Sequence, residues 1–377
     1  MILYLTYNDA PGGVYWSQVT DVVAYLNTLG GARVRLVALV SARDYRGIRR
    51  KIRAHAPDAL VLPMVPGVKR WRGNRFLVYL LCRFMRPSAI LARGVLGTWM
   101  ALRARDRRLV AKVGFDARAA YAAEWEEYRI IDDDALIGQF RALEAEAVAR
   151  ADMRLAVSRA LVQHWRERYG YAGNDHVVIP CTLGRAHVQE RGETPVERPL
   201  PEAHADDVIA AYAGSSAGWQ SFALLNALLR EALVQQPRLK VLFLSQADAA
   251  IEALVQDFPG RVARRWVPAQ EVPLLLRGCD VALLVREDAV TNRVASPTKF
   301  AEYLACGLPV VISEGIGDFS AAVVREELGT LCPVGAPLPP LRRPSAVERM
   351  RLQAYARAHF TKESFRSAYV GLLARLG

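Results

Sequence analysis

The stretch Ser296-Pro297-Thr298-Lys299-Phe300-Ala301-Glu302-Tyr303-Leu304-Ala305-Cys306-Gly307-Leu308-Pro309-Val310-Val311-Ile312-Ser313 predicts a short helix followed by a strand. Ser296 can cap a helix with its hydroxyl, and Pro297 suits the first helical position because its missing N–H needs no partner there. Apolar residues recur at helical spacing, and Gly307 supplies a left-handed stop. Pro309 prevents continuation, so the apolar run 310–312 predicts a buried strand.

The start of this helix has the features of an anion site. Free amides and the positive end of the helix dipole gather there, and Lys299 adds a full charge in the first turn. Such a cation opposes the dipole by roughly 0.3–1 kcal/mol, so Lys299 is better placed for a ligand phosphate than for stability. Glu302, about one turn on, could accept hydrogen bonds from sugar or ribose hydroxyls. The spacing also allows an ordinary surface ion pair between the two side chains.

Length and composition set the outer bounds. A chain of 377 residues exceeds what one core usually supports, so two domains are expected. No stretch approaches the length of a membrane span, and residues 1–7 lack the basic flank and cleavage site of a signal peptide, which predicts a cytoplasmic protein. The cysteines are odd in number and far apart, as suits reduced core thiols better than disulfides or a zinc site: Cys82, Cys181, Cys279, Cys306 and Cys332.

Positive charge is concentrated in one region. Between Arg33 and Lys112 there are 20 lysines and arginines against three aspartates, a balance of +17 that exceeds the +12 of the whole chain. Such a field could meet nucleic acid, anionic lipid or a phosphorylated substrate. Within it, residues 68–87 mix cations with Trp, Phe, Tyr and Leu, the composition of a segment that could lie in a membrane interface. The alternative is a core helix with arginines on its solvated side.

Strands and helices alternate over residues 1–183, which predicts a parallel sheet. Gly12 and Gly13 follow the first strand, where they would let backbone approach a ligand, although the third glycine and the downstream acid of a dinucleotide fingerprint are missing. A polar linker is expected over 184–205, a second alternation over 206–346, and a final helix over about 347–377. The predicted strands are 1–7, 34–40, 59–62, 89–92, 109–115, 153–158, 177–181, 207–213, 240–244, 262–267, 280–285 and 310–312.

Two acidic features of the first half could be functional. Asp116 and Arg118 follow a predicted strand, and ligands of doubly wound sheets sit beyond the carboxyl ends of strands. They suit substrate contacts, with a loop salt bridge as the alternative. The run 132–134, three aspartates, resembles a metal-binding motif, but it directly precedes a helix, where Asp caps and first-turn acids are expected.

The second half carries the more specific pattern. A glycine loop with Gly214 and Ser215 follows the strand 207–213, and, like the loop of Gly12 and Gly13, it is expected to contact the donor. Arg286 follows the strand 280–285 directly upstream of the opening stretch. With the Gly-Gly loop, the Ile-Pro-Cys linker entrance and the unit Ser-Pro-x-Lys-x-x-Glu-Tyr-Leu-Ala-x-Gly-x-Pro-Val-Val, nearly the whole chain resembles the GT-B retaining glycosyltransferases of family 4, of the kind found in bacterial surface-polysaccharide assembly.

The resemblance implies two Rossmann-like doubly wound domains facing across a cleft. It implies a nucleotide sugar bound mainly by the second domain, a glycan or polyprenyl-linked acceptor bound mainly by the first, no cofactor, no metal, and a last helix that crosses back to the first domain. The activity expected is that of a retaining hexosyltransferase (EC 2.4). Nucleic acid is not expected as a partner, and peripheral contact with the inner face of the plasma membrane is a further expectation from residues 68–87.

Carried over by position, Glu302 corresponds to the second Glu of the family's Glu-x7-Glu motif, whose carboxylate holds the donor ribose. The first Glu would fall at Val294, and the family's phosphate-binding Arg and Lys would fall near Ser215 and Trp219-Gln220, so this chain departs from the pattern at both places. The donor phosphates are therefore expected to bind to other groups of this chain. The backbone near Pro268 corresponds to the place where the family binds the nucleotide base. The groups expected for the phosphate are Arg286, Arg293, Lys299 and the helix amides after Ser296.

The chemistry implied is electrostatic stabilisation of a departing nucleotide diphosphate and an oxocarbenium-like sugar, without a nucleophile. Front-face substitution is favoured, and Asp116 is the candidate to orient or deprotonate the acceptor hydroxyl. Cleft closure would exclude water. Three alternatives remain: a sugar-nucleotide epimerase of the same architecture, a non-catalytic GT-B partner subunit, and a basic nucleic-acid-binding scaffold, for which no recognised module is present.

Overall fold

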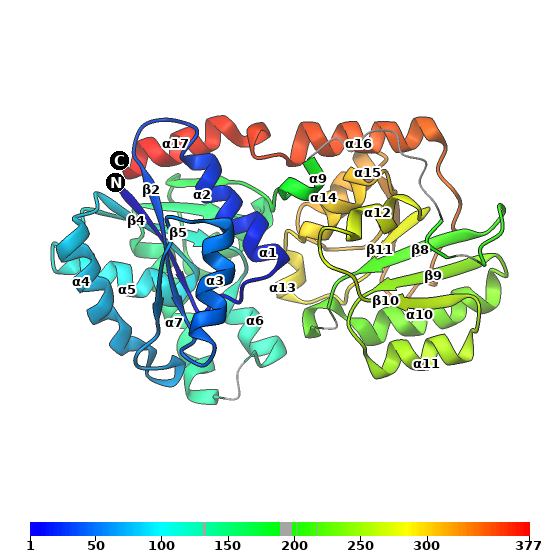
Figure 1. Cartoon of the computed structure of the whole chain (residues 1–377), viewed down its shortest axis with the longest axis horizontal. Helices are drawn as coiled ribbons and strands as arrows, with labels where there is room; N and C mark the ends of the chain where they lie inside the picture. Colours follow the sequence, from blue (N-terminus) through cyan, green and yellow to red (C-terminus); the bar gives the residue numbers. More distant parts are fainter. Residues whose placement is uncertain (131–132, 189–197, 201, 216) are drawn as a thin grey trace. The chain divides into compact units, whose positions relative to one another are not determined.

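The computed structural model describes residues 1–130, 133–188, 198–200, 202–215 and 217–377. The chain divides into two compact units, each with its own parallel sheet (Figure 1). Unit 1 comprises Met1–Gly184 and Phe365–Gly377, and unit 2 comprises Arg185–Ser364. Much of the linker predicted over 184–205 lies outside the described residues.

The sheet of unit 1 has seven parallel strands in the order β3-β2-β1-β4-β5-β6-β7. Chain order reverses at the pair β1 and β4, so this pair is the topological switch point of a doubly wound sheet. The bounds are β1 (Ile2–Tyr7), β2 (Val34–Val40), β3 (Leu60–Pro63), β4 (Ala89–Arg93), β5 (Lys112–Ala117), β6 (Met153–Ala156) and β7 (His176–Val178).

Helices of unit 1 pack on this sheet and are capped where the sequence indicates. Asp133 accepts a hydrogen bond from the Leu136 amide at 3.0 Å, so it caps α7, while Asp132 lies outside the described residues. No group of three acidic, Cys or His side chains among the described residues is placed to hold a metal. The helices are α1 (Gly13–Tyr15), the π-helix η1 (Trp16–Thr20), α2 (Asp21–Leu26), α3 (Tyr45–His55), the 3-10 helix η2 (Val68–Asn74), α4 (Arg75–Met85), α5 (Gly94–Asp106), α6 (Tyr121–Tyr128), α7 (Asp134–Arg150), α8 (Arg159–Tyr169) and α17 (Arg366–Leu376).

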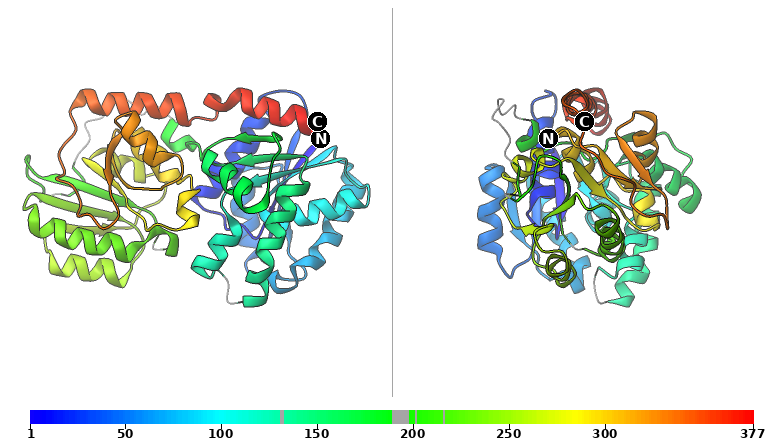
Figure 2. Two further views of the ribbon diagram at one scale, coloured as in Figure 1. Left: turned by 180° about the vertical axis from the view of Figure 1, so that it is seen from behind. Right: turned by 90° about the vertical axis from the view of Figure 1, so that its right-hand side faces the viewer.

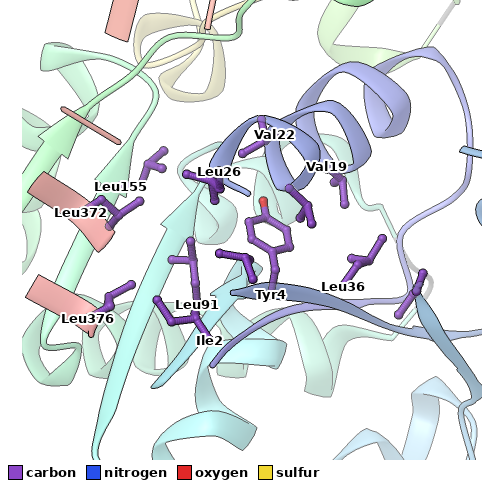
Figure 3. Close-up of a cluster of buried hydrophobic side chains, with 14 of the residues drawn as sticks. Ile2, Tyr4, Val19, Val22, Leu26, Leu36, Leu91, Leu155, Leu372 and Leu376 are labelled. Atoms are coloured by element: carbon purple, nitrogen blue, oxygen red, sulfur yellow. The ribbon is translucent and has the colours of Figure 1, made fainter. Parts of the chain in front are cut away.

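The core of unit 1 joins the two ends of the chain. Tyr4 of β1 lies at its centre beside Val19 and Leu26, and Leu372 and Leu376 of α17 approach from the other side (Figure 3). These side chains are at most 1 % exposed, and burying one Leu stabilises a fold by roughly 1.5–3 kcal/mol. The last turns of α17 are therefore part of the hydrophobic core of unit 1.

Unit 2 repeats the same strand order with six parallel strands, β10-β9-β8-β11-β12-β13. The pair β8 and β11 is its switch point. Two sheets of this order confirm the predicted class of two Rossmann-like, doubly wound domains. The bounds are β8 (Val208–Ala213), β9 (Leu239–Leu244), β10 (Val262–Arg265), β11 (Val281–Leu284), β12 (Val310–Ser313) and β13 (Gly329–Cys332).

The helices of unit 2 connect these strands. They are α9 (Arg185–Val188), the 3-10 helix η3 (Gly218–Gln220), α10 (Phe222–Gln235), α11 (Ala249–Asp257), α12 (Val272–Arg277), α13 (Val290–Arg293), α14 (Thr298–Ala305), α15 (Phe319–Arg325) and α16 (Ala346–Phe360). None of the described helices of either unit is long and apolar enough to cross a bilayer.

The segment expected as one helix over 347–377, packed on the first domain, is instead two helices that belong to different units (Figure 2). Helix α16 packs on α14, where Phe360 meets Phe300 edge to face with ring centroids 5.7 Å apart. Thr361 then takes an extended conformation (φ −86°, ψ 160°), which ends the helix, and only α17 packs on the strands of unit 1.

Candidate functional site

The candidate site of unit 2 lies at its switch point, where loops leave the carboxyl ends of β8 and β11. Ligands of open parallel sheets bind at such points, because the loops diverge there and leave the strand ends accessible. β8 is followed by Gly214 and by Gln220 of η3, and β11 is followed by Arg286. Lys299, in the first turn of α14, joins them although it is 79 residues from Gln220 in sequence.

Gly214 makes room for the lysine side chain. Its φ of +145° is rarely adopted by residues with a side chain, and a Cβ at this position would lie 2.3 Å from Lys299 Nζ. Both observations require glycine here. The structure therefore brings together two residues that the sequence singled out separately.

One amide oxygen receives both cations. Gln220 Oε1 accepts a hydrogen bond from Lys299 Nζ at 2.9 Å and another from Arg286 Nη2 at 3.1 Å. Arg286 Nη1 also donates to Asn292 Oδ1 at 3.2 Å, and Lys299 Nζ lies 4.1 Å from the centroid of the Tyr212 ring. We call these residues the Gln220 cluster: Tyr212, Gly214, Gln220, Arg286, Asn292 and Lys299.

Hydroxyl groups fix the backbone beside Arg286. The Arg286 amide donates to Ser313 Oγ at 2.6 Å, and the Glu287 amide donates to Ser221 Oγ at 2.8 Å. Arg286 is 5 % exposed as a whole residue. Hydrogen bonds therefore hold a buried arginine both at its backbone amide and at its guanidinium group. A preorganised cation of this kind loses little freedom when it meets a ligand.

The surroundings of the Gln220 cluster disfavour the positive charge of Lys299. Burial lowers the pKa of Lys299 well below its ordinary value, the neighbouring charge of Arg286 lowers it further, and Glu302 offsets this only in part. Among the described residues no carboxylate forms an ion pair with the Lys299 ammonium. A cation that faces an amide dipole and an aromatic ring is poorly compensated, so an anion bound here would be strongly favoured.

The amino end of α14 adds further donors. Within the described chain, no acceptor bonds the amides of Thr298 and Lys299, whereas the Phe300 amide turns back to the Pro297 carbonyl at 3.1 Å. The prediction that Ser296 caps this helix is wrong. Pro297 occupies the cap position in an extended conformation (ψ 126°) with no side-chain cap, and the buried Ser296 precedes it. The expected helix–strand order is otherwise confirmed, since α14 ends before Gly307 and β12 begins at Val310.

Glu302 lies about one turn beyond Lys299 on α14. Its side chain is half-buried, and its carboxylate makes no hydrogen bond or ion pair with any described residue, so the proposed surface ion pair with Lys299 is absent. Val294, at the place of the family's first Glu, is 3 % exposed and packs as an apolar side chain. Glu302 is therefore a carboxylate available to a ligand, without the second one that the resemblance implies.

Three other predicted donor residues lie apart from the Gln220 cluster. Arg293 was expected to bind phosphate, but it forms an exposed ion pair with Asp288, Nε to Oδ1 at 2.6 Å, which lowers the pKa of that aspartate. Ser215 is exposed, and its carbonyl accepts the Tyr212 hydroxyl at 2.7 Å. Pro268 follows β10, two strands from β8 in the sheet, and accepts only the Glu271 amide in a local turn, 2.9 Å, among the described contacts.

The switch point of unit 1 contains a different arrangement. Asp116 is fully buried, and its Oδ1 lies 2.7 Å from Arg118 Nε while the Tyr4 hydroxyl donates to its Oδ2. Arg93 Nη1 lies 3.8 Å from the same Oδ2, and Arg93 Nε lies 3.5 Å from Asp9 Oδ2. Oδ2 of Asp116 therefore accepts hydrogen bonds, whereas Oδ1 takes part in an ion pair but has no hydrogen-bond partner among the described residues. These ion pairs suit the carboxylate to orienting Arg118 and Arg93.

Gly12 ends the loop after β1, and Gly13 is the first residue of α1. A Cβ on either residue would meet nothing within 4 Å, so open space surrounds them and no steric reason demands glycine. The helix that begins there continues as the π-helix η1, a feature that frequently marks functional positions. Asp9 in the same loop was not singled out from the sequence, and burial raises its pKa against the opposing effect of Arg93.

Three members of the Gln220 cluster were not predicted from the sequence to bind a ligand: Gln220 itself, Asn292 and Tyr212. Polar residues just after a predicted strand or glycine loop are a usable signal, and Gln220 and Asn292 satisfy it. Their contacts with Lys299 and Arg286 are tertiary and leave no trace in local spacing.

Comparison with known proteins rests on solved structures, because no family model and no curated protein sequence matches the chain. A sucrose-phosphate synthase from Thermosynechococcus elongatus is 15 % identical over 100 % of this chain and 98 % of its own, with a TM-score of 0.69. HepE from Anabaena, in complex with UDP and glucose, is 15 % identical over 99 % of each chain, with a TM-score of 0.67. The fold is GT-B.

A putative UDP-N-acetylglucosamine 2-epimerase from Listeria monocytogenes is also similar, at 11 % identity over 99 % of this chain and 95 % of its own, with a TM-score of 0.56. The GT-B fold is thus shared by proteins named for different reactions. At these identities the likeness establishes the architecture, whereas the activity of the chain is determined by the residues of its site.

Proposed function

We propose that the chain is a retaining glycosyltransferase (EC 2.4) that moves a sugar from a nucleotide-diphosphate donor to a hydroxyl of a glycan or lipid-linked acceptor, without a metal ion. The observation that carries this proposal is the pair of buried cations, Lys299 and Arg286, that share Gln220 Oε1 at the switch point of unit 2. Buried positive charge at the carboxyl ends of parallel strands suits a phosphorylated ligand.

In this proposal the donor diphosphate lies against Lys299, Arg286 and the open amides of α14. Arg286 offers a planar fork of donors and Lys299 a point charge, both of which bind phosphate oxygens. Gly214 lets backbone and ligand approach closely, and Glu302 accepts hydrogen bonds from the ribose. The loop at Pro268 remains our candidate for contacts with the base.

Departure of the nucleotide diphosphate is the step that these cations would accelerate. Negative charge grows on the leaving phosphate as the bond to the sugar breaks, and preorganised cations in a water-poor site stabilise that charge. The cations would supply this stabilisation in place of a metal ion. A protonated Lys299 is needed for this role, and the bound phosphate itself raises the pKa of Lys299 toward its ordinary value.

The role proposed for Asp116 is positional. It holds Arg118 and Arg93 at the switch point of unit 1, where Gly12, Gly13 and the two guanidinium groups would contact the acceptor or the transferred sugar. The acceptor proton would then pass to the leaving phosphate. This assignment follows from the ion pairs of Asp116 and keeps one of the two roles expected from the sequence, in which Asp116 orients or deprotonates the acceptor hydroxyl.

The comparisons support a nucleotide sugar as substrate. HepE was solved with UDP and glucose and also with UDP-glucose. UDP is therefore the first nucleotide to test on this chain, and GDP the second. Donor base, sugar and acceptor are separate questions that one binding screen begins to resolve.

The deciding experiment is calorimetric titration of the full chain with UDP, GDP, ADP and the corresponding monophosphates, with and without EDTA. We expect one diphosphate to bind with its monophosphate at least about tenfold weaker, because each lost charge-assisted contact costs about 1.5–3 kcal/mol. EDTA is expected to change neither affinity nor turnover. Failure of all diphosphates to bind would refute the proposed function.

Nuclear magnetic resonance of the sugar product separates transfer from epimerisation. A retaining transferase releases free nucleotide diphosphate and gives a product with the anomeric configuration of the donor. A 2-epimerase, the activity for which the similar Listeria monocytogenes protein is named, would instead invert the C2 centre of the sugar. C2 inversion by this chain would replace the transferase proposal.

A further inference from the structure

Helix α4 of unit 1 is labelled in Figure 1. It carries a stripe of large apolar side chains that are exposed. Phe76, Leu80 and Phe84 are 57 %, 54 % and 77 % exposed, and their spacing of four residues places them on one face of the helix. The opposite face, with Val78 and Cys82, is buried and packs toward α5. The core of unit 1 thus accounts for one side of α4, and the exposed stripe is available to a partner.

Cationic side chains lie near both ends of this stripe, and the sequence around it contains no acidic residue. The sequence contains no Asp or Glu between Asp58 and Asp106. Exposed cations precede the stripe on η2 and follow it at the end of α4, and none of them forms an ion pair with a described residue: Lys69, Arg70, Arg72, Arg83 and Arg86. Arg75 also lies over the Phe76 ring, 4.7 Å from its centroid.

A depression adjoins the carboxyl end of α4. It has a volume of about 530 Å³, is open to solvent, and is lined by Arg86, Arg105 and Arg108 together with Pro87 and residues 109–111. Arg105 is paired with Asp152 at 2.6 Å, whereas Arg86 and Arg108 form no ion pair within the part of the chain that the structure describes. Guanidinium groups around an open hollow suit a phosphate head group.

We propose that α4 and its flanking arginines bind the surface of an anionic lipid bilayer. Phe76, Leu80 and Phe84 enter the boundary between head groups and acyl chains, while the cations contact lipid phosphates. A second copy of the chain is disfavoured as the occupant because two such faces carry charge of the same sign. Nucleic acid would meet the cations but would give the exposed Leu80 no apolar contact.

This inference goes beyond sugar transfer and depends on a different unit of the chain. Lipid binding through α4 can therefore fail while the nucleotide site is functional, and the reverse also holds. Membrane affinity of this type combines apolar burial with attraction to anionic lipid, so it weakens as salt screens the charges.

The test is co-sedimentation of the full chain with vesicles of phosphatidylcholine alone and with vesicles that contain about 30 % phosphatidylglycerol. We expect binding to the anionic vesicles, loss of that binding at high salt, and no binding to the neutral vesicles. Equal binding to both vesicle types would overturn the proposal, as would binding that is indifferent to salt.

Matched variants locate the binding surface. The triple variant Phe76→Ser, Leu80→Ser, Phe84→Ser is expected to weaken binding at least about tenfold because its apolar contact is removed. Its control is Val234→Ser with Val347→Ser, which changes valines that are 73 % and 70 % exposed on α10 and α16 and should leave binding unchanged. Equal losses in the two variants would refute a site at α4.

Charge reversal gives a second matched pair. Arg83→Glu with Arg86→Glu should weaken binding at least about 25-fold, since each cation near the surface contributes about fivefold. Arg49→Glu with Arg50→Glu alters net charge by the same amount on α3, which has no exposed apolar stripe, and should cost less than about threefold. Equal effects would mean a general electrostatic field rather than a site.

Insertion is tested directly and does not depend on the stability of these variants. Phe84→Trp is expected to shift its fluorescence to the blue and to be quenched by brominated lipid only when anionic vesicles are present. A Trp at this position that stays in water would overturn the proposal. Binding to RNA or DNA in place of vesicles, or dimerisation abolished by the triple serine variant, would equally replace the lipid by another occupant.

Discussion

The switch points of the two units occupy the same place in the same strand order, yet they compensate buried charge differently. In unit 1, Arg93 and Arg118 face the carboxylates of Asp9 and Asp116. In unit 2, Lys299 faces the amide oxygen of Gln220 and the ring of Tyr212. A buried charge paired with its opposite is stable by itself, whereas one that faces only dipoles is not. The charges of the first network are balanced by ion pairs, although some of its buried atoms, among them Asp116 Oδ1 and Arg118 Nη1, have no hydrogen-bond partner among the described residues. The second network gains from an anion.

The largest effect expected from this comparison is a loss of stability in unit 1. Asp116→Asn leaves Arg118 and Arg93 buried without their shared carboxylate, which should destabilise the fold by about 3–5 kcal/mol. Urea denaturation followed by circular dichroism measures this. Asp58→Asn, which breaks an exposed pair with Arg33, is the control and should cost no more than about 1 kcal/mol. A stable Asp116→Asn protein that has lost turnover would instead make Asp116 the base.

The next effect has the opposite sign for stability. Lys299→Met removes a poorly compensated buried charge, so the unliganded protein should gain roughly 0.5–2 kcal/mol of stability. Turnover and diphosphate affinity should fall about 100-fold or more, equivalent to about 2.7 kcal/mol. Thermal unfolding and calorimetric titration measure the two quantities. Arg293→Ala, which alters the neighbouring exposed pair with Asp288, should leave both nearly unchanged.

An unstable or fully active Lys299→Met protein would contradict the comparison. In the first case Lys299 would be a structural cation like those of unit 1. In the second the diphosphate would bind elsewhere. A loss confined to Arg293→Ala would place it at Arg293, one of the groups expected for the phosphate from the sequence.

A smaller effect follows from the close approach of Gly214 to Lys299. Gly214→Ala places a methyl group where Lys299 Nζ lies and forces a side chain into an unfavourable φ, so the lysine must move. Diphosphate affinity should fall about tenfold, with a stability loss of about 1–3 kcal/mol. Gly138→Ala at an exposed position of α7, where a Cβ meets nothing within 4 Å, is the control. It should leave diphosphate affinity unchanged and stabilise the fold by about 0.5–1 kcal/mol, because alanine is favoured over glycine inside a helix. Unchanged affinity in Gly214→Ala would show that the position of Lys299 is not critical.

The smallest effect is a dependence on pH. Because the pKa of Lys299 is lower in the folded chain than its ordinary 10.5, the unfolded chain binds the proton more readily between the two values. Stability of the unliganded protein should therefore rise with pH across that interval. An anionic ligand raises the pKa of Lys299, so diphosphate affinity should fall with rising pH, by at most about tenfold per unit, and binding should take up protons.

Calorimetry in buffers of different ionisation enthalpy measures this proton uptake. Work above about pH 7 keeps the phosphate itself ionised, since its second pKa is near 6. Lys299→Met should show no uptake over the same interval. Uptake that persists in the variant would assign the proton to another group.

The fold was largely predictable because its signals are local. Apolar runs and alternation identified nearly every strand of both sheets, and β2 was predicted with its observed bounds. The last strand β13 and helix α15 were missed, since a four-residue strand with one buried side chain carries little pattern. The predicted strand at 109–115 begins three residues later, because Arg108 takes a left-handed conformation (φ +57°) and pairing with β4 starts at Lys112.

The site was predictable in part. Gly214, Arg286 and Lys299 were selected from their places after strands and at a helix start, and the structure brings them together. Arg293 satisfied the same criteria and lies in an exposed ion pair. Nothing in the spacing distinguishes the two arginines, because Asp288 pairs with Arg293 only through the turn that precedes α13.

The sequence by itself determined the order of the elements, and with it the two parallel sheets and the loops that reach their carboxyl ends. It placed cations, glycines and carboxylates in those loops, since periodicity, caps and turn residues act over a few neighbours. Only the tertiary structure decided which charges are compensated. Asp116 meets Arg118 and Arg93, whereas Lys299 meets an amide 79 residues away, because desolvation and Coulomb interactions depend on distance in space.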